Sequence, residues 1–213
     1  MFGKRKKYGA IGIGAMIVFI AMVLVAGIAA SVLIQTSNTL QRQAMTSGQE
    51  TIGEVATGVS VYAVEGHVDS SSSKIDKLAI IVVPRAGSTP IDLSTTVLQL
   101  SNSTVKCILS YDSNNFQSSP AATGLFNTSA FSLAADKFGV IVLNDPDGSC
   151  KSGSTPVINK GDKVALTVNV TAAFNGLPTR TYVWGTVMPE QGAPGIISFT
   201  TPASYVYSVY QLQ

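Results

Sequence analysis

The chain has 213 residues, and 12% of them are charged, about half of the fraction that is usual for globular domains. Ser, Thr, Asn and Gly fill the polar positions instead, a composition typical of an exposed, β-rich extracellular protein rather than a cytosolic enzyme. The net charge of +2 comes from the basic cluster at residues 4–7, without which acidic residues outnumber basic ones. This weakly acidic body excludes the basic surface of a nucleic-acid-binding protein.

An uncharged and almost wholly apolar run occupies residues 10–34, shortly after the basic cluster. As an α-helix this run would span about 37 Å, which is enough to cross the hydrocarbon core of a bilayer. The basic cluster favours the cytoplasmic side, so the rest of the chain is expected on the outside. The sequence therefore predicts a membrane-inserted N-terminal helix followed by an exported domain.

Three interpretations of this N-terminus are open. An ordinary secretory signal would be cut after the apolar run, at a small-residue site such as residues 26–30, and a plain membrane anchor would be retained whole. The third places the cut between Gly9 and Ala10, just after Lys6 and Lys7, so that residues 1–9 form a leader and the helix stays on the mature protein. That arrangement resembles the class III signal peptide of type IV pilin-like proteins, and we expect it here.

The predicted helix continues past the apolar run and covers residues 10–58. An apolar-to-small stripe recurs there at spacings of three and four, formed by Leu40, Ala44, Gly48, Ile52, Val55 and Val59. The second half of the helix is therefore amphipathic, whereas the first half is apolar all round. Such a first half must be buried, either in lipid or among neighbouring copies of the same helix.

Residues 59–213 are interpreted as one β domain. Short runs of β-branched and aromatic residues, separated by turn-forming clusters, predict an antiparallel β-sandwich. Residues 174–178 are expected to form a hairpin loop between two strands. The expected fold class is α+β, a long N-terminal apolar α-helix followed by an antiparallel β-sandwich. The predicted strands cover residues 59–64, 77–83, 96–100, 105–111, 138–143, 164–170, 181–187 and 204–210.

Two kinds of covalent site are candidates in the β domain. Three N-glycosylation sequons begin at Asn102, Asn127 and Asn169, the last of them in a predicted strand. The alternative is unmodified asparagine. The two cysteines, Cys107 and Cys150, are expected to form a disulfide if the domain is extracellular, and to be separate buried thiols otherwise.

A structural calcium or similar divalent ion has one candidate site. Asn144, Asp145 and Asp147 are hard oxygen donors in a turn, the ligand type that calcium prefers, although Pro146 interrupts the pattern and no EF-hand loop surrounds it.

The sequence otherwise requires no cofactor. Glu65, His67 and Asp69 alternate, so they share one face of a strand, which is expected to be solvated rather than metal-binding. There is one histidine, no phosphate-binding glycine loop and no GxSxG motif. We therefore expect no enzymatic role.

Several segments resemble one family. Residues 6–30, 91–94, 136–142, 189–195 and 199–202 together are similar to the archaellins, the archaeal flagellins, and the resemblance covers nearly the whole chain. Bacterial type IV pilins usually carry Glu five residues after the cut, and Gly14 stands at that position here. This departure favours the archaeal branch.

The resemblance implies a structural subunit that polymerises through its N-terminal helix into the archaellum, a swimming filament rotated by a membrane motor. The implied partners are copies of itself and other archaellins, a prepilin-like leader peptidase, and the membrane assembly platform with its motor ATPase. Nucleic acid is not among them. The precursor would lie in the cytoplasmic membrane before joining an extracellular filament. The resemblance also implies N-glycosylation and, as in some members, a bound metal ion.

Two other functions remain open at this stage. The first is an archaeal type IV adhesion pilin or pseudopilin, which would form a filament that does not rotate. The second is a membrane-anchored β domain that belongs to the filament stator and binds other envelope components. Cleavage after Gly9 would separate the filament subunits from the anchored domain.

Overall fold

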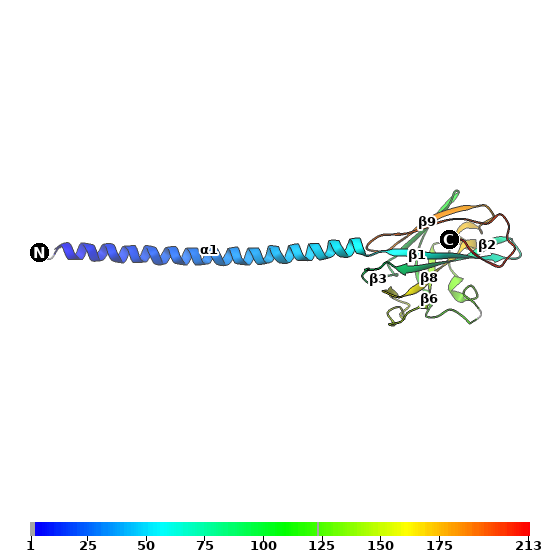
Figure 1. Cartoon of the computed structure of the whole chain (residues 1–213), viewed down its shortest axis with the longest axis horizontal. Coiled ribbons are helices and arrows are strands. Elements are labelled where there is room, and N and C mark those ends of the chain that lie inside the picture. Colours follow the sequence, from blue (N-terminus) through cyan, green and yellow to red (C-terminus); the bar gives the residue numbers. More distant parts are fainter. Residues whose placement is uncertain (1–2, 123) are drawn as a thin grey trace. The chain divides into compact units, whose positions relative to one another are not determined.

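The computed structural model describes residues 3–122 and 124–213, and the side chains of residues 3–8 and 10 lie outside the description. The chain divides into two compact units, Met1–Thr51 and Ile52–Gln213. Figure 1 shows the long helix α1 and the strands of the β domain. This confirms the predicted fold class, a long apolar N-terminal helix followed by a mostly antiparallel β domain.

Helix α1 spans Gly3–Ala56, compared with the predicted 10–58, so it begins inside the expected leader. It contains no proline, and its many aliphatic residues sustain the helical backbone. Just beyond its end, the Thr57 amide still donates to the Gly53 carbonyl at 2.8 Å. Gly58, in contrast, pairs with Ala193 in a β-bridge, which takes the backbone out of the helix.

Nine strands form one sheet in the order β10-β9-β4-β5-β6-β8-β2-β1-β11. Neighbouring strands are antiparallel except for β5 and β6, which are parallel. A separate two-stranded sheet pairs β3 (Ile91–Asp92) with β7 (Val157–Ile158). The strands of the large sheet are β1 Val59–Asp69, β2 Lys74–Pro84, β4 Val97–Asn102, β5 Val105–Gln117, β6 Lys137–Asn144, β8 Lys163–Asn169, β9 Tyr182–Met188, β10 Gly195–Thr200 and β11 Val209–Gln211.

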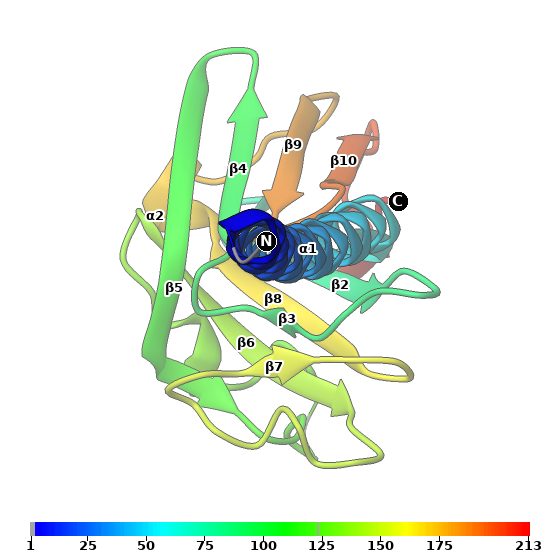
Figure 2. The same ribbon diagram turned by 90° about the vertical axis from the view of Figure 1, so that its left-hand side faces the viewer.

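The large sheet curves until its two ends meet. Figure 2 shows β4, β9 and β10 on one side and β2, β6 and β8 on the other. Gln213 joins the ends, because its backbone carbonyl accepts from Val64 of β1 at 3.1 Å while its side-chain amide bonds to β10. There its oxygen accepts from the Ser198 amide at 2.8 Å, and its nitrogen donates to the Ile196 carbonyl at 3.3 Å. One curved sheet thus encloses the core that a two-sheet sandwich was expected to enclose.

The core lies between the facing sides of this sheet. Fully buried side chains such as Leu78, Leu98, Phe138 and Leu166 come from alternate positions of four strands. Strands β6 and β8 are buried on both faces, which explains their nearly continuous apolar sequences. Their outer faces are covered by residues of the segment between β5 and β6, including the short 3₁₀ helix η1 (Ser129–Phe131). A second, smaller cluster forms there from Ala79, Phe126, Ala130, Phe131, Ile141 and Ala165.

The predicted hairpin at residues 174–178 is wrong. Strand β8 runs directly into a short helix, α2 (Val170–Phe174), and Asn169 caps it by accepting a hydrogen bond from the Ala172 amide at 3.1 Å. Asn175 and Gly176 then adopt positive φ angles of 58° and 79°, which ends the helix. β8 pairs with β2 and β6, whereas β9 pairs with β4 and β10, so the two strands are not neighbours.

The last predicted strand, at residues 204–210, is also largely wrong. This segment is irregular except for Val209–Gln211, which forms β11. Within the irregular part, the ring of Tyr205 packs against the ring of Tyr210 in β11. Strand β10 was not among the predicted runs, although its residues alternate between buried and exposed.

Gly139 in β6 has no room for a side chain, and this makes the packing testable. A Cβ there would lie 2.5 Å from the Asn115 carbonyl oxygen and 2.7 Å from Thr167 Oγ1. Gly139→Ala is expected to lower the free energy of unfolding by about 1–3 kcal/mol, the usual range for overpacking. Thermal unfolding of the detergent-solubilised chain, followed by the fluorescence of Trp184, measures this. Gly53→Ala adds the same methyl group in open space on α1 and should leave the midpoint unchanged or slightly higher, because alanine favours a helix more than glycine does. Equal midpoints for both variants would contradict the packing.

Candidate functional site

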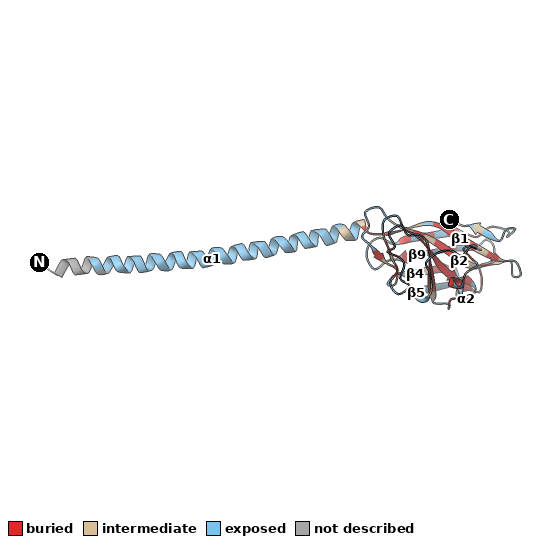
Figure 3. Ribbon diagram, turned by 90° about the horizontal axis from the view of Figure 1, so that it is seen from below, coloured by how far each residue is buried: buried red, intermediate tan, exposed pale blue. Residues whose placement is uncertain are grey.

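The apolar half of α1 is exposed along its whole length. The large apolar side chains between Ile11 and Ile34 retain 52% to 70% of their accessible surface. Figure 3 shows this exposure as a pale blue helix, in contrast to the buried strands of the β domain. Burying one such side chain is worth about 1.5–3 kcal/mol, so this surface strongly favours an environment that removes it from water.

The apolar side chains of residues 11–34 surround the helix on every side, since no charged residue occurs in this stretch. A single flat partner would cover one side and leave the others in water. Within the described residues, one helix, at Ile11–Ala56, is long and apolar enough to span a membrane. The arrangement therefore suits lipid or a bundle of helices, both of which surround the helix completely.

The second half of α1 contains polar side chains that need no outside partner. Four threonine hydroxyls donate to the carbonyl one turn earlier in the same helix, a bond that satisfies the hydroxyl and leaves the methyl group facing outward. This half of α1 can consequently contact neighbouring helices without leaving those hydroxyls buried and unsatisfied. The bonds join Thr36 to Val32 at 3.0 Å, Thr39 to Gln35 at 2.9 Å, Thr46 to Arg42 at 3.0 Å and Thr51 to Ser47 at 2.8 Å.

The predicted processing residues lie near the start of α1. Lys6, Lys7, Gly9 and Ala10 all have helical backbone, and Gly9 is exposed. The side chains of Lys6, Lys7 and Ala10 lie outside the described part of the chain. Cleavage between Gly9 and Ala10 therefore stays a prediction.

The three sequon asparagines have different surroundings. Asn127 is exposed in the loop that precedes η1, and no hydrogen bond of its side chain is found in the described residues. Asn102 is half-buried at the end of β4, where its Oδ1 accepts from the Val105 amide at 2.9 Å. Asn169 uses both ends of its amide, because Oδ1 caps α2 and Nδ2 donates to the Leu133 carbonyl at 3.2 Å. Asn127 is thus the most accessible of the three.

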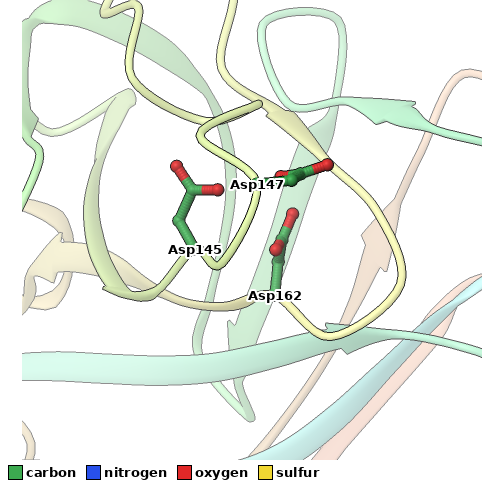
Figure 4. Close-up of side chains that lie close together, drawn as sticks. All are labelled: Asp145, Asp147 and Asp162. Carbon is green, nitrogen blue, oxygen red and sulfur yellow. The ribbon is translucent and has the colours of Figure 1, made fainter.

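Three carboxylates gather where β6 and β8 meet neighbouring loops. Oxygens of Asp145, Asp147 and Asp162 all lie within 4.8 Å of one another, and Figure 4 shows the three groups. Backbone amides of Gly148 and Ser149 donate to Asp145 Oδ1 at 2.7 and 3.1 Å. The pKa of Asp147 is lowered, first by a hydrogen bond from the Asn159 side chain and then by the Ser149 amide. These hydrogen bonds favour the charged form of the Asp147 carboxylate.

Asp162 is the residue that the sequence prediction missed. Its side chain is 1% exposed, and its Oδ2 accepts from the Asn159 amide at 2.8 Å. Its Oδ1 is buried without a hydrogen-bond partner among the described residues, which is costly for a carboxylate. The third expected ligand, Asn144, instead donates its side-chain amide to the Gly161 carbonyl at 2.8 Å. The structure thus brings Asp145 and Asp147 together with Asp162.

Glu65, His67 and Asp69 do not assemble a site. His67 Nδ1 lies 2.7 Å from Asp76 Oδ1, within hydrogen-bonding distance. Asp69 binds the adjacent turn, and hydrogen bonds from Ser71 lower its pKa to about 2. The side chains of His67 and Asp69 therefore have local partners and do not converge on a shared site with Glu65.

Both cysteines are free thiols in the structure, so the expected disulfide is not present. Cys107 is half-buried on β5 and its Sγ donates to the Ala173 carbonyl at 3.3 Å. Cys150 is fully buried, and burial raises the pKa of its thiol to about 12, with smaller contributions from Asp145 and Asp162. Neither thiol is poised for nucleophilic chemistry.

Comparison with known proteins gives a consistent result. Flagellin B2 of Methanocaldococcus jannaschii is 50% identical over 213 residues, covering 98% of this chain and 97% of that protein. The crystal structure of archaeal flagellin FlaB1 from the same organism has a TM-score of 0.68 at 41% identity, covering 74% of this chain and 98% of its own. The archaeal flagellum of Methanospirillum hungatei strain JF1 has a TM-score of 0.61 over 93% of this chain and 98% of its own; at 16% identity it shows a shared fold.

The family comparison covers most of the sequence. The family model described as archaeal-type flagellin matches residues 9–199, from just before the apolar run to the end of the β10 region. This match agrees with the relative that has 50% sequence identity over nearly the full length, and both indicate the same family. The chain belongs to the archaeal-type flagellin family.

Proposed function

We propose that this chain is the structural subunit, the archaellin, of an archaellum, and that it polymerises through α1. The observation that carries the proposal is the exposed apolar surface of residues 11–34, which lies on all sides of the helix. Packing many copies of this helix side by side would remove that surface from water and release a large free energy. Membership of the archaeal flagellin family supports the same function.

The same surface serves the subunit in two environments. Before assembly, α1 lies in the cytoplasmic membrane, where lipid covers residues 11–34. A prepilin-like leader peptidase removes residues 1–9, and the membrane assembly platform with its motor ATPase passes the subunit to an extracellular filament, alone or with other archaellins. There neighbouring helices replace the lipid. The basic cluster at residues 4–7, followed by Gly9 and then directly by the uncharged apolar run, supports a mature start at Ala10.

The two alternatives make different demands on the chain. An archaeal adhesion pilin or pseudopilin shares the leader and the apolar helix, but its filament does not rotate. A membrane-anchored stator domain would retain its N-terminus and keep α1 in lipid. Family membership favours the archaellin over both.

Sugar attachment is proposed at the accessible sequons. Asn127 is exposed, and Asn102 is half-buried with only its Oδ1 in a hydrogen bond among the described residues. At Asn169 both amide atoms hold α2 and the covering segment in place. Modification is therefore expected at Asn127 and Asn102 more than at Asn169.

A divalent cation such as calcium is proposed at Asp145, Asp147 and Asp162. Three carboxylates within reach of one ion supply the hard oxygen ligands that calcium prefers. The unpartnered Oδ1 of buried Asp162 supports this proposal, since a cation would satisfy it. Such an ion would tie the loop after β6 to the start of β8.

The central test is a charge placed in the middle of the apolar segment. Leu24→Lys is expected to abolish filaments, because a lysine at the centre of a membrane helix costs about 2.5–3.5 kcal/mol and a buried unpaired charge also destabilises a helix bundle. Ser72→Lys is the matched control, since Ser72 is exposed in the turn between β1 and β2. Electron microscopy of sheared filaments, with equal precursor levels, gives the comparison.

Processing must be verified in both variants. N-terminal sequencing of the subunits should begin at Ala10, so that a defect in insertion is not mistaken for a defect in assembly. Filaments of normal length built from processed Leu24→Lys subunits would mean that α1 is not the buried core. An intact Met1 terminus in the unaltered protein would favour the anchored domain instead.

The glycan proposal predicts a difference among peptides of one protein. Mass spectrometry of filament subunits should find added glycan mass on the peptides that contain Asn102 and Asn127, with lower occupancy at Asn169. Asn127→Gln should shift the mobility of the intact subunit, whereas Asn169→Gln should not. Unmodified masses at both Asn102 and Asn127 would refute the assignment.

The cation proposal predicts a calcium-dependent stability. Calcium at about one hundred times its dissociation constant should stabilise the fold by about 2.7 kcal/mol, seen as a higher midpoint of thermal unfolding. Asp162→Asn should remove most of that increase. Asp136→Asn, which changes an exposed aspartate outside the cluster, should keep it. A midpoint that is the same with calcium and with a chelator would exclude the site.

A further inference from the structure

Charged side chains are rare along α1. Beyond the leader, the helix carries three of them, Arg42, Glu50 and Glu54. The threonines of this half are satisfied within the helix, but these charges are not. Among the side chains that the structure describes, no carboxylate oxygen lies within 4.0 Å of the Arg42 guanidinium.

Helix geometry explains why Arg42 and Glu50 do not meet within one chain. Glu50 follows Arg42 by eight residues, which places it about 12 Å further along the axis and about 80° around it. Ion pairs on a single helix need a spacing of three or four residues. The two opposite charges therefore lie on the same side of the helix but beyond each other's reach.

The charges avoid the stripe that is suited to close packing. Relative to Arg42, the positions of Leu40, Ala44 and Gly48 lie about 160° to 240° around the axis. Helix α1 thus has an apolar-to-small side and a charged side in its second half. In a bundle of copies both sides face neighbours, and an arginine left there without a partner would be strongly unfavourable.

We propose, resting on the filament function above, that Arg42 of one copy pairs with Glu50 of a neighbouring copy. Two parallel copies of α1 bring these residues together when one helix is displaced along the axis by about 12 Å, the rise of eight residues. The guanidinium can then bind the carboxylate through two parallel hydrogen bonds. Glu54 adds negative charge one turn further on. The partner of this surface is therefore a second copy of the chain, and the pair fixes the axial register of the helices.

Charge reversal tests the pair in the full-length chain. Arg42→Glu and Glu50→Arg should each lower the amount of polymer by at least about tenfold, which corresponds to about 1.4 kcal/mol. The double reversal should restore most of it, because the opposite charges then meet again. Arg42→Lys keeps the charge and should retain assembly. Lys106→Glu, on the exposed β4–β5 hairpin, changes the net charge equally and should have no effect.

Cross-linking supplies a second measurement that does not depend on charge. In the double variant Arg42→Cys and Glu50→Cys, the two cysteines of one chain are too far apart for a disulfide, which needs Cα atoms within about 7 Å. Oxidised filaments should yield a ladder of covalent oligomers, because each copy links to two neighbours. The two single variants, and the unaltered chain with Cys107 and Cys150, define the background.

The outcomes separate this inference from the proposed function. Absence of either the charge rescue or the ladder, in cells whose unaltered subunits form normal filaments, overturns the pairing and leaves the filament function intact. Normal assembly of the single reversals overturns it as well. A filament that forms from Leu24→Lys subunits would instead overturn the function on which the pairing rests.

Discussion

The apolar surface that surrounds residues 11–34 is the constraint on which the rest of the molecule depends. Because it has no polar side, this part of α1 requires apolar surroundings on every side. The β domain must therefore fold without help from this segment, and it does so around its own core of residues such as Leu78 and Phe138. A single chain thus combines a helix with an exposed apolar surface and a β domain that has its own core.

Polar groups on α1 divide into those that are satisfied and those that need a neighbour. Threonine hydroxyls bind the preceding turn, so they tolerate burial without choosing a partner. Arg42 and Glu50, in contrast, need an oppositely charged partner on a neighbouring helix, and such a partner is in reach only at particular axial displacements of the two helices. Apolar contacts therefore drive association, while the few charges select one arrangement among many that are similarly apolar.

The sequence predicted the elements that local residue patterns determine, and it failed where contacts between residues distant in the sequence decide the structure. Helix α1 was predictable because an unbroken apolar run without proline is a local signal, and β6 and β8 were predictable as apolar runs. The hairpin at residues 174–178 failed because Asn169 caps a short helix there and β9 pairs elsewhere. Asp162 was missed because it joins Asp145 and Asp147 only through the fold. No alternation of residues reveals that β5 and β6 run parallel or that the sheet closes.

Closure of the sheet through Gln213 affects how neighbouring β domains can contact one another in a filament. A strand at the margin of a sheet offers unpaired amides and carbonyls, which readily recruit a strand from another molecule. The Gln213 side chain binds the Ser198 amide and the Ile196 carbonyl of β10, one of the two end strands of the sheet. Domains arrayed along a filament meet at very high local concentration. Because these backbone groups of β10 are already bonded, neighbouring β domains can lie side by side without forming a continuous intermolecular sheet.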